Sequence, residues 1–464
     1  MESIDPSFPD EKPIHFIAID SAGKFFIQEE ALVIIKNIKK KIAIITVAGQ
    51  YRTGKSYLLN RLLGRQSGFE LGSTINPCTK GIWMWSKPIN INENLQAIFL
   101  DTEGLASLSR NVHVDTMIFA LALLMSSYFI YNSMHALNEK ALESLGLVVS
   151  LSKYIHVNLR PGNVSEDLEE YSHYFPYFMW IVRDFALELV NTEQQSVTDR
   201  QYLENALRPI DVTTGGDPDQ IASKNEIRGK LTTFFKERDC ITLVRPLSDE
   251  KLLREISKVP YENLRPEFRS KMELLIKKVY NSIKPKVIDG QPLTGEMFAT
   301  LLEQYVTAFN EGKVPTIETA WDQVINLELD RVIKESIEQY KRKVAELSLD
   351  RLPMMQEEIK KVDEEAKEVA YKKFYESELV NVDPERMLMA RTKIESSFSE
   401  IFKKLRDENY NLSYKDSEEL FNKLYGKIRE KMDTLTTLTY DVVTSNWQKL
   451  KEVILHLTLV LPTK

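Results

Sequence analysis

The chain has 464 residues, a formal net charge of −7 and two cysteines, with 43% hydrophobic and 28% charged residues. This length exceeds what one hydrophobic core usually supports, so at least two domains are expected. The acidic balance argues against a nucleic-acid-binding protein without excluding a local basic face, and two cysteines exclude a disulfide framework and fit a reducing compartment.

The first part of the chain, up to about residue 283, alternates short apolar runs with helical patterns. Most of the apolar runs are continuous, which is typical of strands covered on both faces. Strands are expected at residues 14–20, 42–49, 95–101, 126–132, 177–182 and 240–244. Helices are expected between them, for example in SYLLNRLLG and MIFALALLM. This alternation predicts an α/β domain with a mostly parallel sheet over residues 1–283.

One apolar stretch, residues 116–138, carries no Asp, Glu, Lys or Arg and could be mistaken for a membrane span. Six Ser, Asn and His side chains dilute it, and its fully apolar part is too short to cross the hydrocarbon core. A buried helix followed by a buried strand is therefore expected here.

The second part of the chain contains no strand candidate after residues 284–295 and is rich in Glu, Lys, Leu and Ile. Asp383-Pro384-Glu385 predicts a helix start, because Asp is a common N-cap and Pro suits the first helical position. Ser413 with Asp416 is a weaker capping candidate. Apolar residues recur at helical spacing at Leu420, Leu424, Ile428, Met432 and Leu435. The pattern predicts an all-α helical bundle over residues 284–464, and a truncation at its C-terminus is left open.

Residues 49–56, GQYRTGKS, match the phosphate-loop template of P-loop proteins. The loop follows an expected strand and precedes an expected helix, as backbone N–H groups and a helix N-terminus must surround the β-phosphate. Lys55 is expected to reach the β- and γ-phosphates, and Ser56 to ligate Mg²⁺. The residues expected to line the nucleotide here are Gly49, Gln50, Tyr51, Arg52, Thr53, Gly54, Lys55, Ser56 and Tyr57.

A second phosphate-side motif, DTEG, follows the strand expected at residues 95–101. Asp101 is expected to hold Mg²⁺ and the Gly104 N–H to sense the γ-phosphate. Small GTPases place a water-orienting glutamine after this glycine, but here the residue is Leu105. Arg52 could instead fold over the phosphates as an internal arginine finger, the alternative being an exposed loop arginine.

Several segments together strongly resemble the guanylate-binding proteins, large GTPases of the dynamin superfamily that are related to atlastins. The segments are GQYRTGKSYLLN, TKGIWMW, DTEGL, FALALLMSSYFIYNS and WIVRDF, with a fainter likeness in LLEQYVTAFNEGKVPTIETAW. The resemblance implies that Arg52 is the family's arginine finger and that Thr79 ligates Mg²⁺ and helps to place the attacking water. It also implies that Glu103 joins the water network. Arg183-Asp184 is similar to the family's RD motif, whose aspartate pairs with guanine.

The residues themselves agree with that guanine assignment. Arg183-Asp184 follows an expected strand, at the edge where α/β sheets bind ligands. A carboxylate can accept two N–H donors from guanine and none from the matching edge of adenine. Arg245 is similar to the start of the family's guanine cap, although the basic cluster usual after it is missing. Pro77 also replaces a serine that assists the water in many relatives.

The function expected is that of a Mg²⁺-dependent GTPase that produces GDP, with a further step to GMP left open, and with a G domain that forms a homodimer over the nucleotide. As in the family, this dimer would drive rearrangement and assembly of the helical domain. A GTP-gated scaffold with little hydrolysis and an ATPase of the same superfamily are the alternatives. The protein is expected to be cytoplasmic, with recruitment to membranes left open and no anchor or nucleic-acid partner expected in this chain.

Overall fold

The computed structural model describes residues 11–71, 81–102, 104, 112–145, 174–191, 193–211, 217–313, 317–376, 379, 382–433, 447–449 and 451–452. The chain divides into two compact units, Met1–Val324 and Ile325–Lys464. The domain boundary expected after residue 283 lies inside the first unit and stays a prediction. The hairpin of β10 (Val287–Ile288) and β11 (Gln291–Pro292) and helix α11 (Gly295–Asn310) follow that point and still belong to the first unit.

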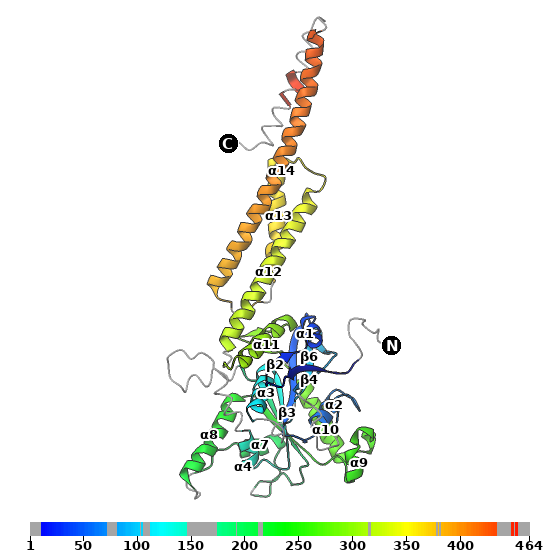
Figure 1. The fold of residues 1–464 in the computed structure, drawn as a ribbon, viewed down its shortest axis with the longest axis vertical. Helices are drawn as coiled ribbons and strands as arrows, with labels where there is room; N and C mark the ends of the chain where they lie inside the picture. Colours follow the sequence, from blue (N-terminus) through cyan, green and yellow to red (C-terminus); the bar gives the residue numbers. More distant parts are fainter. Residues whose placement is uncertain are drawn as a thin grey trace. The chain divides into compact units, whose positions relative to one another are not determined.

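A mixed sheet forms the centre of the first unit (Figure 1). Its strands among the described residues are β1 (Pro13–Ile19), β2 (Phe25–Ile27), β3 (Lys41–Gly49), β4 (Ile82–Trp85), β5 (Ile89–Asn92), β6 (Leu95–Thr102), β7 (Tyr128–Met134), β8 (Tyr177–Arg183) and β9 (Arg238–Leu243). The order is β2-β1-β4-β6-β3-β7-β8-β9, with β5 on β6. Strands β6, β3, β7, β8 and β9 pair in parallel, and the others pair antiparallel.

Helices cover both faces of this sheet (Figure 1). On one face, Ala43, Ile45 and Val47 of β3 share an apolar cluster with α2 (Lys55–Leu62) and α10 (Pro266–Ser282). On the other face, α3 (Val112–Met125) packs on β3, and α11 packs on α3 and on α1 (Glu29–Lys36). The remaining helices of the unit are α4 (Glu139–Ser144), α7 (Asp199–Ala206), α8 (Pro218–Phe234) and α9 (Glu250–Arg254), with 3-10 turns at Ile256–Lys258 and Tyr261–Asn263.

These elements confirm the α/β fold and each of the six predicted strands, within two residues at either end. The buried helix and strand predicted in residues 116–138 are α3 and β7, and the side chains of 117–125 are all buried. Strands β2, β4 and β5 were not predicted, because three or four residues carry too little periodicity. Among the helices of the described residues, none has the length and apolarity that a membrane crossing requires.

The second unit is helical, as predicted. It contains most of α12 (Ile317–Ser348), then α13 (Gln356–Tyr375) and α14 (Pro384–Asp433). Helix α13 runs antiparallel to α12, since Tyr340 meets Asp363 while the earlier Glu335 meets the later Lys373. Apolar and aromatic side chains fill the space between the helices, with Tyr340 stacked on Phe398 at 4.1 Å between ring centroids.

The helix start predicted at Asp383 is confirmed, since Asp383 Oδ1 accepts from the Glu385 N–H at 2.9 Å and α14 begins at Pro384. The start predicted at Ser413 with Asp416 is wrong, because α14 continues through both residues. No glycine or proline interrupts residues 385–425, so nothing ends the helix there. Of the predicted apolar stripe, Leu424 is buried and Leu420 is 44% exposed. The side chains of Ile428, Met432 and Leu435 lie outside the described part.

Candidate functional site

The ends of four strands that are far apart in the sequence lie at one edge of the sheet. The carboxyl ends of parallel strands lie at the same edge, where α/β proteins bind ligands. The register places Val47 opposite Asp101 and Gly49 opposite Asn132, and it places Met134 opposite Arg183. The ends of β3, β6, β7 and β8 therefore converge on the phosphate loop.

The glycines of the phosphate loop are required by its geometry. Gly49 has a φ of 146°, and a Cβ built on it would lie 2.1 Å from the Asn132 carbonyl oxygen. Gly54 has a φ of 77° and is the N-cap residue of α2. Arg52 also has a positive φ of 64°, its side chain is exposed, and its guanidinium lies 5.4 Å from the centre of the Tyr51 ring. A loop of this conformation turns its N–H groups toward one concave side.

Hydrogen bonds within the loop fix this turn. The Thr53 hydroxyl donates to the Gln50 carbonyl at 2.9 Å, and the Lys55 ammonium donates to the same oxygen at 3.1 Å. Outside the loop, the Gln50 side-chain amide donates to Ser144 Oγ of α4 at 3.1 Å. Lys55 is 7% exposed, so its ammonium is held against the loop before any ligand binds.

The residues predicted to face a metal ion lie side by side. Ser56, at the start of α2, donates from its hydroxyl to Asp101 Oδ2 at 2.6 Å, and Asp101 is only 1% exposed. Gly104 follows on the same edge, where a Cβ would lie 2.5 Å from Tyr51 Cα and 2.9 Å from Lys55 Nζ. Only a glycine backbone can approach the loop this closely.

The predicted guanine residues separate into two environments. Arg183 is buried, with its guanidinium donating to the Gly54 carbonyl at 3.4 Å and lying 5.9 Å from the Phe268 ring centre. This burial lowers the pKa of the Arg183 guanidinium from its usual value. Asp184 instead has a φ of 54° and a partly exposed carboxylate, with Arg245 Nε 4.0 Å from its Oδ2. Arg183 thus contacts the phosphate loop, while Asp184 and Arg245 remain accessible.

Some predicted site residues lie outside the described part of the chain. These are Thr79 and Glu103, together with Pro77 and Leu105, which stand where relatives or small GTPases carry a residue that assists the attacking water. Their assigned roles stay predictions.

Comparison with known proteins decides the family. The model of the guanylate-binding protein N-terminal domain matches residues 22–287, and that of the C-terminal domain matches residues 289–441. The chain belongs to the guanylate-binding protein family. The resemblance that the motifs predicted is therefore confirmed, and the first model covers the phosphate loop, Asp101 and Asp184.

Individual relatives support the same assignment. Human guanylate-binding protein 4 is 36% identical over 348 residues, which are 74% of this chain and 54% of the relative. Mouse guanylate-binding protein 3 is 38% identical, covering 68% and 51%, and human guanylate-binding protein 7 is 37% identical, covering 70% and 51%. The chain spans about half the length of these curated relatives. A solved structure of Era from Aquifex aeolicus, bound to GDP and AlF4⁻, matches 48% of this chain and 61% of that chain. At 15% identity and a TM-score of 0.21, that likeness is too weak to carry an argument.

Sequence reasoning missed two residues that contact the phosphate loop of this family member. Asn132, at the end of β7, donates from Nδ2 to the Thr53 carbonyl at 2.8 Å. Ser144 accepts from Gln50. Asn132 could have been found as an amide at the end of a buried strand, whereas Ser144, near a helix end, carries no local signal.

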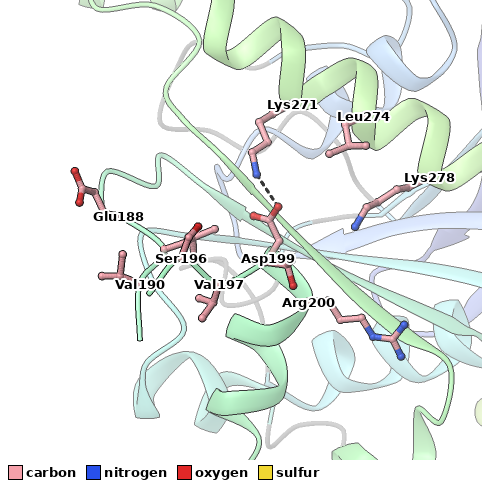
Figure 2. A pocket seen from close by; sticks show the side chains of 11 residues that line it. Glu188, Val190, Ser196, Val197, Asp199, Arg200, Lys271, Leu274 and Lys278 are labelled. Carbon is pink, nitrogen blue, oxygen red and sulfur yellow. Dashed lines mark hydrogen bonds and ion pairs between the residues drawn. The ribbon is translucent and has the colours of Figure 1, made fainter. Parts of the chain in front are cut away.

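Figure 2 shows the side chains that line a second site, a groove of about 610 Å³. It is lined by residues 188–190 and 196–200 and by Lys271, Leu274 and Lys278 of α10, and none of the predicted nucleotide residues lines it. The Lys271 ammonium is paired with Asp199 Oδ2 at 2.6 Å. Asp199 Oδ1 also accepts from the Thr242 N–H at 2.9 Å. Among the described strands, β9 pairs with β8 on one side only, so the hydrogen bond from Thr242 to Asp199 covers part of its outer edge.

Proposed function

We propose that this chain binds GTP with Mg²⁺ across the phosphate loop and hydrolyses it. The observation that carries the proposal is the loop at residues 49–56, with its glycine geometry, beside the contact of Ser56 with Asp101. Membership of the guanylate-binding protein family supports it. The Lys55 ammonium donates to the Gln50 carbonyl of this loop and would exchange that oxygen for the β- and γ-phosphates.

The donor set fits Mg²⁺. The Ser56 hydroxyl and the Asp101 carboxylate are oxygen ligands 2.6 Å apart, of the type that Mg²⁺ prefers, and Thr79 would be the third protein ligand. A bound Mg²⁺ would neutralise charge on the β- and γ-phosphates. Asp101 lies near the end of β6, and its hydrogen bond with Ser56 keeps both side chains next to the phosphate loop.

Hydrolysis is proposed to depend on Arg52, Thr79 and Glu103. The exposed Arg52 would fold over the phosphates and stabilise the charge that develops in the transition state, while Lys55 holds the β- and γ-phosphates. Thr79 and Glu103 would position the attacking water, and the Gly104 N–H would sense the γ-phosphate. GDP is the first product, and a second cleavage to GMP is part of the same proposal.

Asp184 is proposed to select guanine. Its carboxylate follows β8 at the ligand-binding edge, and the neighbouring Arg183 holds the Gly54 carbonyl, so that base and phosphate contacts share one rigid strand end. A carboxylate accepts the two N–H donors of guanine, and Arg245 beside it would begin a cap over the base.

Two G domains are proposed to meet over the nucleotide, which would order Arg52 and Thr79 and pass the movement to the helical unit for assembly. These steps, and a cytoplasmic location with recruitment to membranes, rest on the family resemblance. A second candidate is a GTP-gated scaffold that barely hydrolyses, which Pro77 and Leu105 favour because neither can help to position a water.

Turnover at several protein concentrations tests the proposal. The wild type is incubated with GTP or ATP and Mg²⁺ beside Lys55→Ala and Arg52→Ala, and products are separated by chromatography. Arg200→Ala removes an exposed arginine away from the loop and serves as the matched control. The proposal expects GTP turnover that rises per molecule with concentration and fails in the two loop variants only. GTP that binds but stays intact selects the scaffold. Preference for ATP, or unchanged base choice in Asp184→Asn, refutes the guanine assignment.

A further inference from the structure

The side-chain amide of Asn132 contacts the phosphate loop from the neighbouring strand β7. Asn132 is completely buried, and its Nδ2 donates to the Thr53 carbonyl at 2.8 Å. Its backbone already lies in the sheet, opposite Gly49 of β3 and Ile181 of β8. The sheet therefore does not need the amide, and an apolar side chain would fill the site without the cost of burying a polar group.

The direction of this hydrogen bond sets the direction of a peptide group. In a trans peptide the carbonyl and the following N–H point in opposite directions. Holding the Thr53 oxygen toward Asn132 therefore turns the Gly54 N–H away from β7. The next peptide group is held in the same way, because the Gly54 carbonyl accepts from the Leu58 N–H of α2 at 3.0 Å and from Arg183 NH1 at 3.4 Å. Two successive N–H groups at the start of α2 are thereby oriented alike, as binding of a phosphate by a helix N-terminus requires.

A second observation separates Asn132 from ordinary packing. Its Oδ1 is buried and has no hydrogen-bond partner among the described residues. A buried acceptor without a partner is rare and needs an explanation beyond packing. The cost of burying this oxygen is explained if the Nδ2 group of the same amide is needed to hold the Thr53 carbonyl.

We infer that Asn132 is a positioning residue for the β-phosphate of the bound nucleotide, acting through the Thr53–Gly54 peptide group. The inference rests on the proposed nucleotide site and deepens it. Loss of the amide leaves the Thr53–Gly54 peptide free to rotate, so a donor to the β-phosphate is lost. Ligands that carry a β-phosphate should then lose affinity, while a nucleoside monophosphate should lose little.

The test compares the affinities for GDP and GMP, measured by calorimetric titration, in the wild type and in Asn132→Ala. Ser133→Ala is the matched control, because the next residue of β7 is also buried and its Oγ accepts from Trp180 Nε1 at 2.8 Å, away from the loop. If the alanine variant does not fold, Asn132→Val takes its place in the comparison, because valine fills more of the volume of the asparagine side chain and favours a strand.

The expected result is a loss of about 10- to 100-fold in GDP affinity, the size of one hydrogen bond to a charged group, with GMP affinity little changed. Ser133→Ala should keep the wild-type ratio of the two affinities even if its melting temperature falls. Equal losses for GDP and GMP, or an unchanged ratio in the Asn132 variants, overturn the inference. If the wild type binds neither nucleotide, the proposed function itself fails, which is a different outcome.

Discussion

Replacing Gly49 by alanine tests how far the end of β3 depends on the close approach of β7. A Cβ at this position would lie 2.1 Å from the Asn132 carbonyl oxygen and 3.0 Å from its carbon. Ordinary contacts between carbon and oxygen begin near about 3.3 Å, so the two strands would have to separate by about 1 Å. The φ of 146° adds strain for any residue with a side chain.

The two costs can be estimated separately. Backbone strain of this kind costs about 1–3 kcal/mol, and forcing an extra carbon into a packed site costs about 1–3 kcal/mol more. Gly49→Ala should therefore lower the free energy of unfolding by about 2–6 kcal/mol, a large part of the about 5–15 kcal/mol that stabilises a typical domain. Because the separation occurs at the phosphate loop, nucleotide binding should be lost as well.

Two other glycines provide controls. Gly64→Ala keeps the strain of a positive φ, here 69°, but nothing lies within 4 Å of the new carbon. Gly229→Ala lies within α8 with equally open surroundings, and should stabilise the protein by about 0.5–1 kcal/mol. Urea unfolding of all three variants separates strain from the clash. A loss for Gly49→Ala no larger than that for Gly64→Ala would refute the steric argument.

The remaining predictions concern other parts of the chain. Burial lowers the pKa of Lys286 from 10.5 to about 7, so the unfolded state binds more protons between these values and stability rises with pH. Between about pH 7 and about pH 9 this gain amounts to about 2 kcal/mol in the free energy of unfolding, and Lys286→Met should abolish it. Urea unfolding at several pH values measures this, and a variant whose stability still rises with pH as steeply as that of the wild type would contradict the prediction. In the helical unit, Asn409→Ala leaves the buried N–H and C=O of Met354 without their partner and should cost about 2–4 kcal/mol. Tyr340→Phe removes one donor from Asp363 and should cost about 1 kcal/mol. Unfolding followed by circular dichroism should therefore show a larger loss of stability for Asn409→Ala than for Tyr340→Phe, and the reverse order would disprove the reasoning.

Local patterns in the sequence predicted much of this fold. The strand that ends at Gly49, the loop and α2 are contiguous, and each carries its own periodicity and glycine signal. Strands β4 and β5 were missed because four residues carry too little periodicity of their own, even though β5 is joined to its partner β6 by a turn of two residues. The helix start predicted at Ser413 was wrong because a local capping pattern also occurs inside a helix, here α14, that no glycine or proline interrupts at this point.

In the functional site, too, some residues were found from local motifs, whereas others are brought together only by the fold. Lys55 and Ser56 follow from one motif, and Asp101 from a second motif at a strand end. The contacts of Asn132 with Thr53 and of Arg183 with Gly54 join residues 79 and 129 positions apart. Only the order of β3, β7 and β8 in the sheet brings them together, and strand order is not encoded in any local pattern.

The most direct test of the central proposal is the consumption of an equimolar mixture of GTP and ATP by the wild-type chain with Mg²⁺, followed by chromatography. The proposed site predicts that GTP is converted to GDP, alone or with GMP, while ATP remains. Lys55→Ala in the same mixture should leave both nucleotides intact. If ATP is consumed as fast as GTP, or if the Lys55→Ala variant retains the activity, the assignment of the phosphate loop and Asp184 to guanine nucleotide hydrolysis is wrong.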